Sequence, residues 1–303
     1  MSKITRALEK AARERLQRAN EQATVSSSGI VVPVIPVPAA QAVPDRLGEI
    51  AAAGRVTIDP HIVSATAPTS PIAEQYRILR TNLQSLRLKP GVRVIVVTSA
   101  VHGEGKSVTS INLAMSLARQ EKLRVVLVDA DMRRSSVPKW LGLGARPQGF
   151  STALLRDGEL DGCLIQFQDP PLTVLPAGPT AEHPAELLES VALKRVIATL
   201  RAQFDLVIVD APPMLPVADA GILAAQADGV ILVVRAGKTQ RRAALQAHEH
   251  IKQMKARLIG CVLTHVEYYL PGHAQYYRYQ RAAADGNGKA GDGAAPPAGA
   301  KAA

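Results

Sequence analysis

One glycine-rich stretch in this chain has residue types and spacing that could do chemistry. It reads A-V-H-G-E-G-K-S and ends at Ser107. Except for the alanine at its first position, this is the spacing of a phosphate-binding loop, in which small residues let backbone N–H groups curl around phosphate oxygens. Such a loop also needs a lysine for the β- and γ-phosphates and a hydroxyl for Mg²⁺. The stretch predicts a Mg·ATP site contacted by Gly103, Glu104, Gly105, Lys106, Ser107 and Val108.

Carboxylates follow two apolar runs elsewhere in the chain. D-A-D-M-R follows V-V-L-V and begins at Asp129, and D-A-P-P follows V-I-V and begins at Asp210. A single aspartate after a strand is often only a cap or a turn residue. Three of them, Asp129, Asp131 and Asp210, in a chain with a phosphate-binding loop indicate metal binding and catalysis, because Mg²⁺ prefers carboxylate oxygens and water.

Alternating strands and helices must position these residues. The sequence predicts strands at 92–98, 124–128, 206–209, 229–234 and 258–264, and helices at 106–120, 184–203 and 239–256. Continuous apolar strands separated by helices are typical of a parallel sheet that is covered on both faces. The predicted fold is a doubly wound α/β domain of the P-loop NTPase type with a mostly parallel sheet. Ligands of such sheets bind at the carboxyl ends of the strands.

The segments outside this domain differ from it in composition. Residues 1–23 are predicted to form a basic amphipathic helix, which either docks on a partner or membrane surface or is frayed and solvated. Residues 24–70 have the Pro, Ala and Val content of a linker. The P-loop domain is expected at 71–266, a tyrosine cluster at 267–280, and a disordered tail at 281–303. Both tails are expected to be flexible.

Length, charge and cysteine content narrow the function class. The chain has 303 residues, 47% of them hydrophobic, so it can bury at least one full core. Two cysteines are too few for a disulfide framework and fit a reducing cytosol. The formal net charge of +10 suits an anionic membrane surface or an acidic partner, but it is not concentrated enough to indicate nucleic acid. No apolar run is long enough to span a bilayer, so we expect a cytoplasmic protein.

Five of the 6 tyrosines lie close together near the C-terminus of a chain that is only 3% aromatic. They are Tyr268, Tyr269, Tyr276, Tyr277 and Tyr279. An aromatic patch or a platform for stacking on nucleic acid are open alternatives. Beside a predicted Mg·ATP site we favour phosphoacceptors, since each phosphate would add about −1.5 to −2 charge and make the cluster an electrostatic switch.

Taken together, these motifs resemble those of the bacterial protein-tyrosine kinases of polysaccharide export, often called BY-kinases. The P-loop, the D-x-D-x-R at Asp129 and the D-A-P-P at Asp210 carry the resemblance, with a segment at 70–83 that is similar to the family's E-x-x-R-x-x-R helix. The resemblance covers about residues 70–279, and the N-terminal layout is similar to the exosortase-associated subgroup. The chain departs from the family at Ala181-Glu182-His183, where P-P-N is usual, so we expect that loop to differ in shape from the family's.

The resemblance implies a role for each matching residue. Lys106 would hold the β- and γ-phosphates, and Ser107 would ligate Mg²⁺. Asp131 and Asp210 would act on Mg²⁺ directly or through its waters, and Asp129 would be the base for the incoming tyrosine hydroxyl. The strength of this base should matter less than its alignment, because phosphoryl transfer has a loose transition state.

The resemblance also implies partners. Glu74, Arg77 and Arg80 share one face of a helix, which in the family contacts the neighbouring subunit of a homo-oligomeric ring. Without the family match, an ordinary solvated face would be the better interpretation. The family further implies phosphorylation of the tyrosine cluster in trans, and a membrane chain-length determinant or polysaccharide co-polymerase that recruits the kinase to the inner face of the plasma membrane. A cognate tyrosine phosphatase and a role in exopolysaccharide synthesis or export are expected as well, and no nucleic-acid partner is.

Two other functions remain open. One is a partitioning or septum-site ATPase of the same P-loop branch, but those enzymes carry a signature lysine where this chain has Val101. The other is a regulator without catalytic activity that uses ATP only as a conformational ligand. An iron–sulfur carrier is disfavoured, because Cys163 and Cys261 lie far apart and show no C-x-x-C spacing.

Overall fold

The computed structural model describes residues 50–266, except residues 55, 88–90, 121–122 and 145. In these ranges the strands are β1 (Ala51–Ala52), β2 (Val94–Ser99), β3 (Val125–Asp129), β4 (Ile165–Gln166), β5 (Leu172–Leu175), β6 (Leu206–Asp210), β7 (Gly229–Arg235) and β8 (Leu258–Thr264). The helices are α2 (Val63–Thr66), α3 (Pro71–Arg87), α4 (Lys106–Ala118), α5 (Val137–Trp140), α6 (Phe150–Leu155), α7 (Pro184–Glu189), α8 (Val191–Gln203), α9 (Asp219–Ala225) and α10 (Arg241–Gln253).

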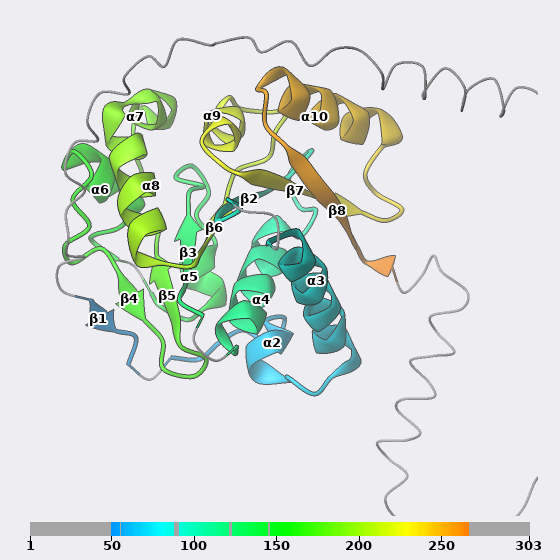
Figure 1. The fold of residues 1–303 in the computed structure, drawn as a ribbon, viewed down its shortest axis with the longest axis horizontal. Coiled ribbons are helices and arrows are strands. Elements are labelled where there is room, and N and C mark those ends of the chain that lie inside the picture. Colours follow the sequence, from blue (N-terminus) through cyan, green and yellow to red (C-terminus); the bar gives the residue numbers. More distant parts are fainter. Residues whose placement is uncertain (1–49, 55, 88–90, 121–122, 145, 267–303) are drawn as a thin grey trace, which may run out of the picture. The chain divides into compact units, whose positions relative to one another are not determined.

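The described strands form one sheet in the order β1-β4-β5-β3-β6-β2-β7-β8 (Figure 1). Neighbouring strands are parallel, except for the antiparallel pair of β4 and β5. Chain order and spatial order differ at the centre, where β2 lies between β6 and β7. Such crossovers require helices on both faces of the sheet. The prediction of a doubly wound, mostly parallel sheet is confirmed.

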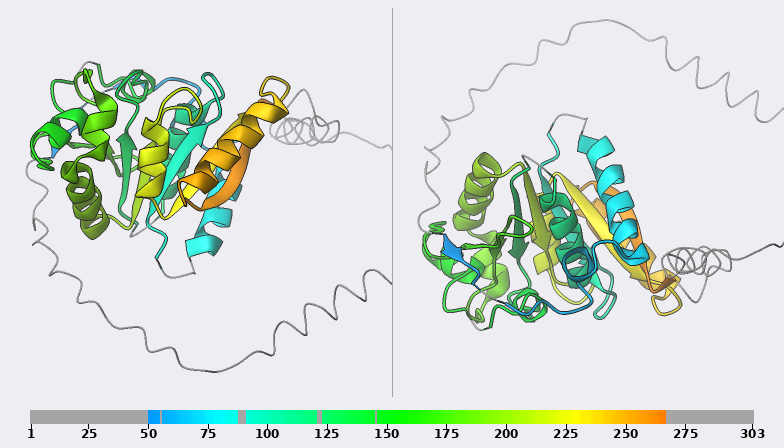
Figure 2. Two further views of the ribbon diagram at one scale, coloured as in Figure 1. Left: turned by 90° about the horizontal axis from the view of Figure 1, so that it is seen from above. Right: turned by 90° about the horizontal axis from the view of Figure 1, so that it is seen from below.

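Helices cover both faces of this sheet. In Figure 2, α9 and α10 lie in front in the view from above, and α2, α3 and α4 lie in front in the view from below. Side chains of β2 alternate between the two layers: Val94 and Val96 pack with α6 to α10, and Ile95 and Val97 pack with α2 to α5. Because both layers are apolar, every residue of β2, β3 and β6 is buried.

The prediction of a linker at 24–70 is wrong for residues 50–70. Residues 50–70 contain β1, which pairs with β4, and α2, which packs against α4. Ile62 is completely buried, and the amide of Asn112 on α4 donates to the carbonyl of His61 at 3.0 Å. Small apolar residues among prolines have the composition of a linker, although here they add a strand to the sheet and pack against α4. Residues 1–49 and 267–303, with the predicted N-terminal helix and the tyrosine cluster, lie outside the described residues.

The helix predicted at 184–203 is also divided in two. Ser190 has an extended backbone, with φ −69° and ψ 161°, so α7 ends before it and α8 begins after it. The hydroxyl of the serine donates to the carbonyl of Leu187 at 2.6 Å, a local bond by which serine competes with helical hydrogen bonding. The elements β1, β4, β5, α2, α5, α6 and α9 were not among the predicted ones. They are short, and too few residues repeat in them to give a clear period.

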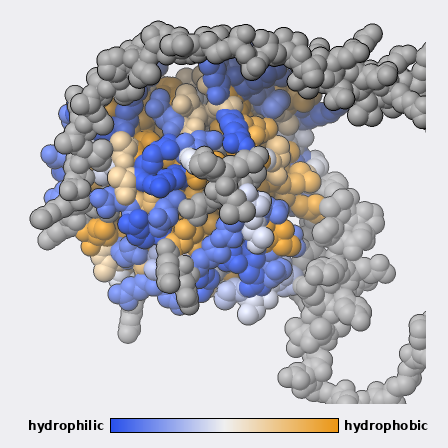
Figure 3. Space-filling view, in the orientation of Figure 1, coloured by the Kyte–Doolittle hydropathy of each residue, from blue (hydrophilic) through white to orange (hydrophobic). Residues whose placement is uncertain are grey.

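The surface of the described part is mixed. On the face seen in Figure 3, hydrophobic residues lie in separate patches among hydrophilic ones. Among the described helices, none combines the length and the apolar character that crossing a membrane demands.

Candidate active site

The phosphate-binding loop joins β2 to α4 and takes its shape from two glycines. Gly103 and Gly105 have φ values of 78° and 91°, in the left-handed region that residues with a Cβ rarely adopt. The chain then enters α4 at Lys106, so the unpaired N–H groups of the first helical turn point into the loop. A helix N-terminus with this loop before it is a favourable place for phosphate.

Hydrogen bonds of Glu104 connect the phosphate-binding loop to residues outside it. The side chain of Glu104 is only 2% exposed and its carboxylate accepts hydrogen bonds from the backbone N–H of Val101, at 3.2 Å, and from the hydroxyl of Thr239. The hydroxyl of Thr264, the last residue of β8, donates to the carbonyl of Glu104 at 2.8 Å. The side chain of Glu104 therefore holds the loop in place, and a nucleotide contact from this residue would involve its main chain.

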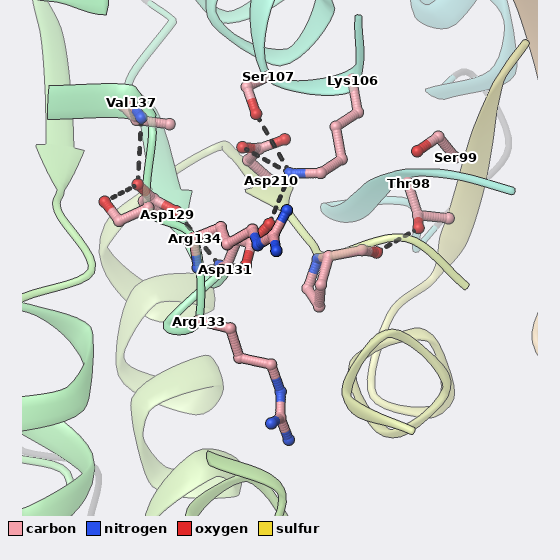
Figure 4. Close-up of polar contacts among 12 residues, drawn as sticks. Thr98, Ser99, Lys106, Ser107, Asp129, Asp131, Arg133, Arg134, Val137 and Asp210 are labelled. Carbon is pink, nitrogen blue, oxygen red and sulfur yellow. Dashed lines mark hydrogen bonds and ion pairs between the residues drawn. The ribbon is translucent and has the colours of Figure 1, made fainter. Parts of the chain in front are cut away.

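Four predicted residues converge beside this loop (Figure 4). Lys106 Nζ lies 2.8 Å from Asp131 Oδ2, 3.7 Å from Asp210 Oδ2 and 3.2 Å from Ser107 Oγ. The hydroxyl of Ser110, one helical turn after Lys106, donates to Asp210 Oδ1 at 2.9 Å. The carboxyl ends of β3 and β6 thus bring both carboxylates to the start of α4, as the topology of a parallel sheet requires.

Asp129 lies beside this group and is completely buried. Its Oδ1 accepts the backbone N–H of Asp131 at 3.2 Å, and its Oδ2 accepts the hydroxyl of Ser135 at 2.7 Å and the N–H of Val137 at 3.2 Å. Burial, followed by the charge of Asp210 on the neighbouring strand, raises the pKa of Asp129 to about 7. A carboxyl group with this pKa can exchange a proton near neutral pH.

Burial also affects the other charged groups of the site. It raises the pKa of Asp210, although the nearby charge of Lys106 opposes this effect. For Lys106, burial alone would lower the pKa, but the charges of Asp210 and Asp131 outweigh it and raise the pKa above its ordinary value. Lys106 is therefore a stable cation among three buried carboxyl groups, and this excess of acidic groups favours a further cation.

The side chains fit a magnesium ion that arrives with a nucleotide. Ser107, Asp131 and Asp210 offer the hard oxygen ligands that Mg²⁺ prefers, and Asp210 Oδ2 is a buried oxygen without a hydrogen-bond partner. In the described part of the chain, no three His, Cys, Asp or Glu side chains are placed to hold a metal by themselves. Mg²⁺ commonly binds through one or two carboxylates, waters and substrate phosphates, which is the set available here.

The two arginines after the aspartates point in different directions (Figure 4). The guanidinium of Arg133 points away from the site and donates to both carboxylate oxygens of Asp219 on α9, at 2.8 and 3.1 Å. Arg134 donates its backbone N–H to Asp131 Oδ1 at 3.0 Å, and its side chain extends toward Lys106. The loops after β3 and β6 are thus tied to each other by a two-pronged ion pair outside the site.

Sequence reasoning missed three residues of this arrangement. Ser110 could have been found, since it lies four residues after Lys106 on the same face of a predicted helix. Ser135 follows the D-x-D-x-R motif but has no distinctive spacing. Asp219 is 86 residues from Arg133, and nothing in the sequence links the two.

The predicted interface residues lie on α3, away from this site. Arg77 pairs with Glu74 and also donates to the carbonyl of Pro68 at 3.0 Å. Arg80 donates to the carbonyl of Ser116 on α4 at 2.9 Å. All three predicted residues are half-buried and make contacts inside their own chain. Val108, predicted near the nucleotide, is half-buried against the core.

Fold and site together define a P-loop nucleotide-binding domain, and comparisons with known proteins agree. The family model described as AAA domain matches residues 92–260. The septum site-determining protein MinD of Pyrococcus horikoshii, solved with Mg-ADP, covers 62% of this chain and 77% of its own, with a TM-score of 0.52 and 21% identity. At that identity the likeness shows the fold alone.

More similar proteins define the group within this class. The chain is 36% identical to the tyrosine-protein kinase YwqD of Bacillus subtilis over 72% of this chain and 91% of the relative. It is 31% identical to the tyrosine-protein kinase CpsD of Streptococcus agalactiae, over 68% and 89%. The kinase domain of the Escherichia coli tyrosine kinase ETK superposes with a TM-score of 0.63 at 25% identity, over 69% of this chain and 81% of that domain. The chain belongs to the family of bacterial tyrosine-protein kinases, which confirms the resemblance found in its motifs.

Proposed function

We propose that this protein transfers the γ-phosphoryl group of Mg·ATP to tyrosine hydroxyls of its own C-terminal cluster. The observation that carries the proposal is the convergence of Lys106, Asp131 and Asp210 beside the phosphate-binding loop, at 2.8 and 3.7 Å from the lysine nitrogen. Membership of the tyrosine-protein kinase family supplies the chemistry of the acceptor.

In this proposal each residue of the site has one task. The N–H groups of the loop and Lys106 bind the β- and γ-phosphates. Ser107, Asp131 and Asp210 would hold Mg²⁺, which supplies charge neutralisation on the phosphate oxygens. The tyrosine oxygen forms its bond to the γ-phosphorus while the bond from that phosphorus to the β–γ bridging oxygen breaks, and ADP leaves. The hydroxyl proton passes to Asp129, whose pKa of about 7 suits a proton acceptor near neutral pH.

The acceptors in this proposal are Tyr268, Tyr269, Tyr276, Tyr277 and Tyr279 of a neighbouring subunit. They follow β8, which ends at Thr264, beside the phosphate-binding loop. The subunits would form a ring through α3, which carries Glu74, Arg77 and Arg80 and also exposes Ile72 and Ile78 by 45% and 47%. Phosphorylated tails would repel one another and the carboxylates of the site, and so loosen the ring.

The cellular setting is proposed from the family. A membrane polysaccharide co-polymerase would recruit the kinase to the inner face of the plasma membrane and activate it, and a cognate phosphatase would reset the tail. The assembly would regulate exopolysaccharide synthesis or export. Co-purification with such a membrane protein, together with a higher rate in its presence, tests this part. Full activity and unchanged location without any membrane partner would contradict it.

A partitioning-type ATPase is the second candidate function, and the residue at position 101 distinguishes it from a kinase. Val101, 38% exposed at the loop, stands where those enzymes carry a lysine for the phosphates of the neighbouring subunit. This substitution favours the kinase. ATP hydrolysis without any phosphotyrosine would favour the ATPase.

The decisive experiment is incubation of the full chain with Mg·ATP, followed by mass mapping of phosphotyrosine. We expect phosphate on the C-terminal cluster of the parent and of Lys194→Met, a control at an exposed lysine of α8. Lys106→Met should fold normally and lose the signal, because its cation is the one aimed at the phosphates. Activity of Lys106→Met within a few-fold of the parent would contradict the assigned site.

Mixing two chains tests whether phosphate is transferred between subunits or within one chain. Lys106→Met, which keeps its tyrosines, is combined with an otherwise native chain that lacks residues 268–279. Phosphate on the Lys106→Met chain shows transfer between subunits, and its absence shows transfer within one chain. Light scattering then compares the sizes of the phosphorylated and unphosphorylated forms, and equal sizes would contradict the loosening of the ring.

A further inference from the structure

A second cavity lies at the same edge of the sheet as the nucleotide site. It has a volume of about 560 Å³ and is formed by the segment after β3, including Ser135, Lys139 and Arg146, and by the segment after β5, including Thr180. Volumes of about 300–1,000 Å³ are usual for sites that bind small molecules or side chains. Because β5 and β3 are neighbours in the sheet, as are β3 and β6, the cavity lies beside the catalytic carboxylates.

Asp129 stands between the two sites. Its Oδ1 accepts the N–H of Asp131, on the side of Lys106, and its Oδ2 accepts the hydroxyl of Ser135, which lines the cavity. In Figure 4, Val137 lies on the side of Asp129 that is away from Lys106. A chain segment that places one side chain at the proposed base can therefore place another in the cavity.

The lining of the cavity suits a dianion. Lys139 and Arg146 are its charged residues. Within the ranges that the structure describes, neither forms an ion pair of 4 Å or less, although the charge of Lys139 also acts on Asp59. Arg146 is half-buried, and its Nε is a buried donor without a hydrogen-bond partner. As residues that line the cavity, Lys139 and Arg146 can each form charge-assisted hydrogen bonds to an anion placed there. A neutral tyrosine would leave both cations unpaired, whereas a phosphate monoester has the oxygens and charge to pair with both.

The tyrosine cluster supplies such a group once its modification begins. Every tyrosine of the cluster has another tyrosine one or two positions away, as in Tyr268-Tyr269 and Tyr276-Tyr277-Arg278-Tyr279. In an extended segment, side chains two positions apart point the same way and lie about 7 Å from each other. A phosphate on Tyr279 can then enter the cavity while Tyr277 faces Asp129.

We infer that this cavity is a phosphotyrosine subsite, which holds one modified tyrosine of the acceptor tail while the next is phosphorylated. The inference rests on the proposed function and deepens it, because it makes the cluster a substrate that improves after its first phosphate. The cavity holds one phosphate beside the base, so further phosphates on the same tail face the carboxylates of the site. Repulsion at that stage releases the tail.

The test uses peptides of residues 267–280 and the full chain in which all five tyrosines of the cluster are replaced by phenylalanine. Each peptide keeps Tyr277 as its only free acceptor. The first carries phosphotyrosine at position 279, the second carries phenylalanine there, and the third carries its phosphotyrosine at the distant position 268. We expect KM for the first peptide to be about tenfold lower than for the other two, as one or two charge-assisted hydrogen bonds would give.

Variants then locate the effect. Lys139→Met and Arg146→Met should each bring the ratio of the KM values of the first two peptides toward one. Lys194→Met, on α8, should keep the tenfold ratio. Lys139 is exposed, so its variant is expected to fold even if the Arg146 variant does not. Equal KM values for the first two peptides in the parent, or a ratio that both variants leave unchanged, would overturn the inference.

Binding without turnover separates this inference from the proposed kinase activity. Calorimetry with the nucleotide-free chain should show tighter binding of the first peptide than of the second, and this difference should shrink in Lys139→Met. That result would support the subsite even if no phosphoryl transfer were found. Displacement of the first peptide by ATP, or by inorganic phosphate at equal concentration, would assign the cavity to those anions and overturn the inference.

Discussion

The phosphate-binding loop and the loop after β3 face each other across the site, and they are held in different ways. The first is shaped mainly by residues of its own: Gly103 and Gly105 have φ values of 78° and 91°, and the buried carboxylate of Glu104 accepts the N–H of Val101 inside the loop and the hydroxyl of Thr239 outside it. The second is held by side chains, with Asp129 bonded to Ser135 and Val137, and Arg133 paired to Asp219.

The function of each loop is accordingly encoded in a different part of the sequence. The positive charge of the first loop comes from the main chain and one lysine, so a short motif contains nearly all of it. The second contributes carboxylates, whose positions depend on partners that are far away in the sequence. A substitution of one outer contact should therefore affect the first loop little and the second more.

The largest effect is expected where the two loops meet. Asp210→Asn removes one of the two carboxylates near Lys106 and the candidate ligand of Mg²⁺, so the rate of tyrosine phosphorylation should fall by about 10²- to 10³-fold. The free energy of unfolding should not fall together with the rate, because burial disfavours the charged form of Asp210 in the parent. Initial rates and urea unfolding measure the two effects. The control is Asp205→Asn, which removes an ion pair with Arg124 at the opposite edge of the sheet. A rate loss as large in the control would contradict the assignment.

The second prediction tests whether side chains hold the loop after β3. Asp219 is 1% exposed, so Arg133→Met leaves a buried carboxylate without its partner, and the free energy of unfolding should fall by about 1–3 kcal/mol. Asp219→Asn in the same chain should restore part of this loss. A double-mutant cycle by urea unfolding measures the coupling energy between Arg133 and Asp219. The value of kcat should fall in Arg133→Met and recover in part in the double variant, because the pair ties the two aspartate loops together. Additive effects on both quantities would show that the pair does not position the loop.

The two loops also differ in how much of their structure the sequence predicts. The P-loop, the sheet and the three aspartates were predictable, because short motifs and apolar runs specify them locally. The contact of Arg133 with Asp219 was not, since the two residues are 86 positions apart and only the fold brings them together. Ile62 was assigned to a linker because its neighbours are small and include proline, although it is completely buried. The lining of the second cavity likewise comes from two segments, after β3 and after β5, that only the fold brings together.

The third prediction concerns Asp129 and the pH dependence of stability. The pKa of this carboxyl group is about 7 in the folded chain and about 4 when unfolded. Between these pH values the folded chain binds more protons than the unfolded chain. The contribution of Asp129 to the free energy of unfolding should therefore be highest below about pH 4 and should decrease as pH rises toward 7. The slope is at most about 1.4 kcal/mol per pH unit. Urea unfolding of the protein in EDTA, without nucleotide, measures it. Asp129→Asn should remove this part of the slope, and an identical pH profile in parent and variant would contradict the raised pKa.

The smallest effect is expected for an outer contact of the phosphate-binding loop. Thr264→Val keeps the shape of the side chain but removes the hydroxyl that donates to the carbonyl of Glu104. If the glycines and the buried carboxylate of Glu104 already fix the loop, the free energy of unfolding should fall by only about 0.5–1.5 kcal/mol and KM for ATP should change less than about threefold. Thr81→Val, at an exposed hydroxyl that bonds only within α3, is the matched control. A large rise in KM for ATP in Thr264→Val alone would show that the end of β8 sets the shape of the loop. Because the tyrosine cluster follows β8 in the chain, that result would also link the loop mechanically to the segment that carries its acceptors.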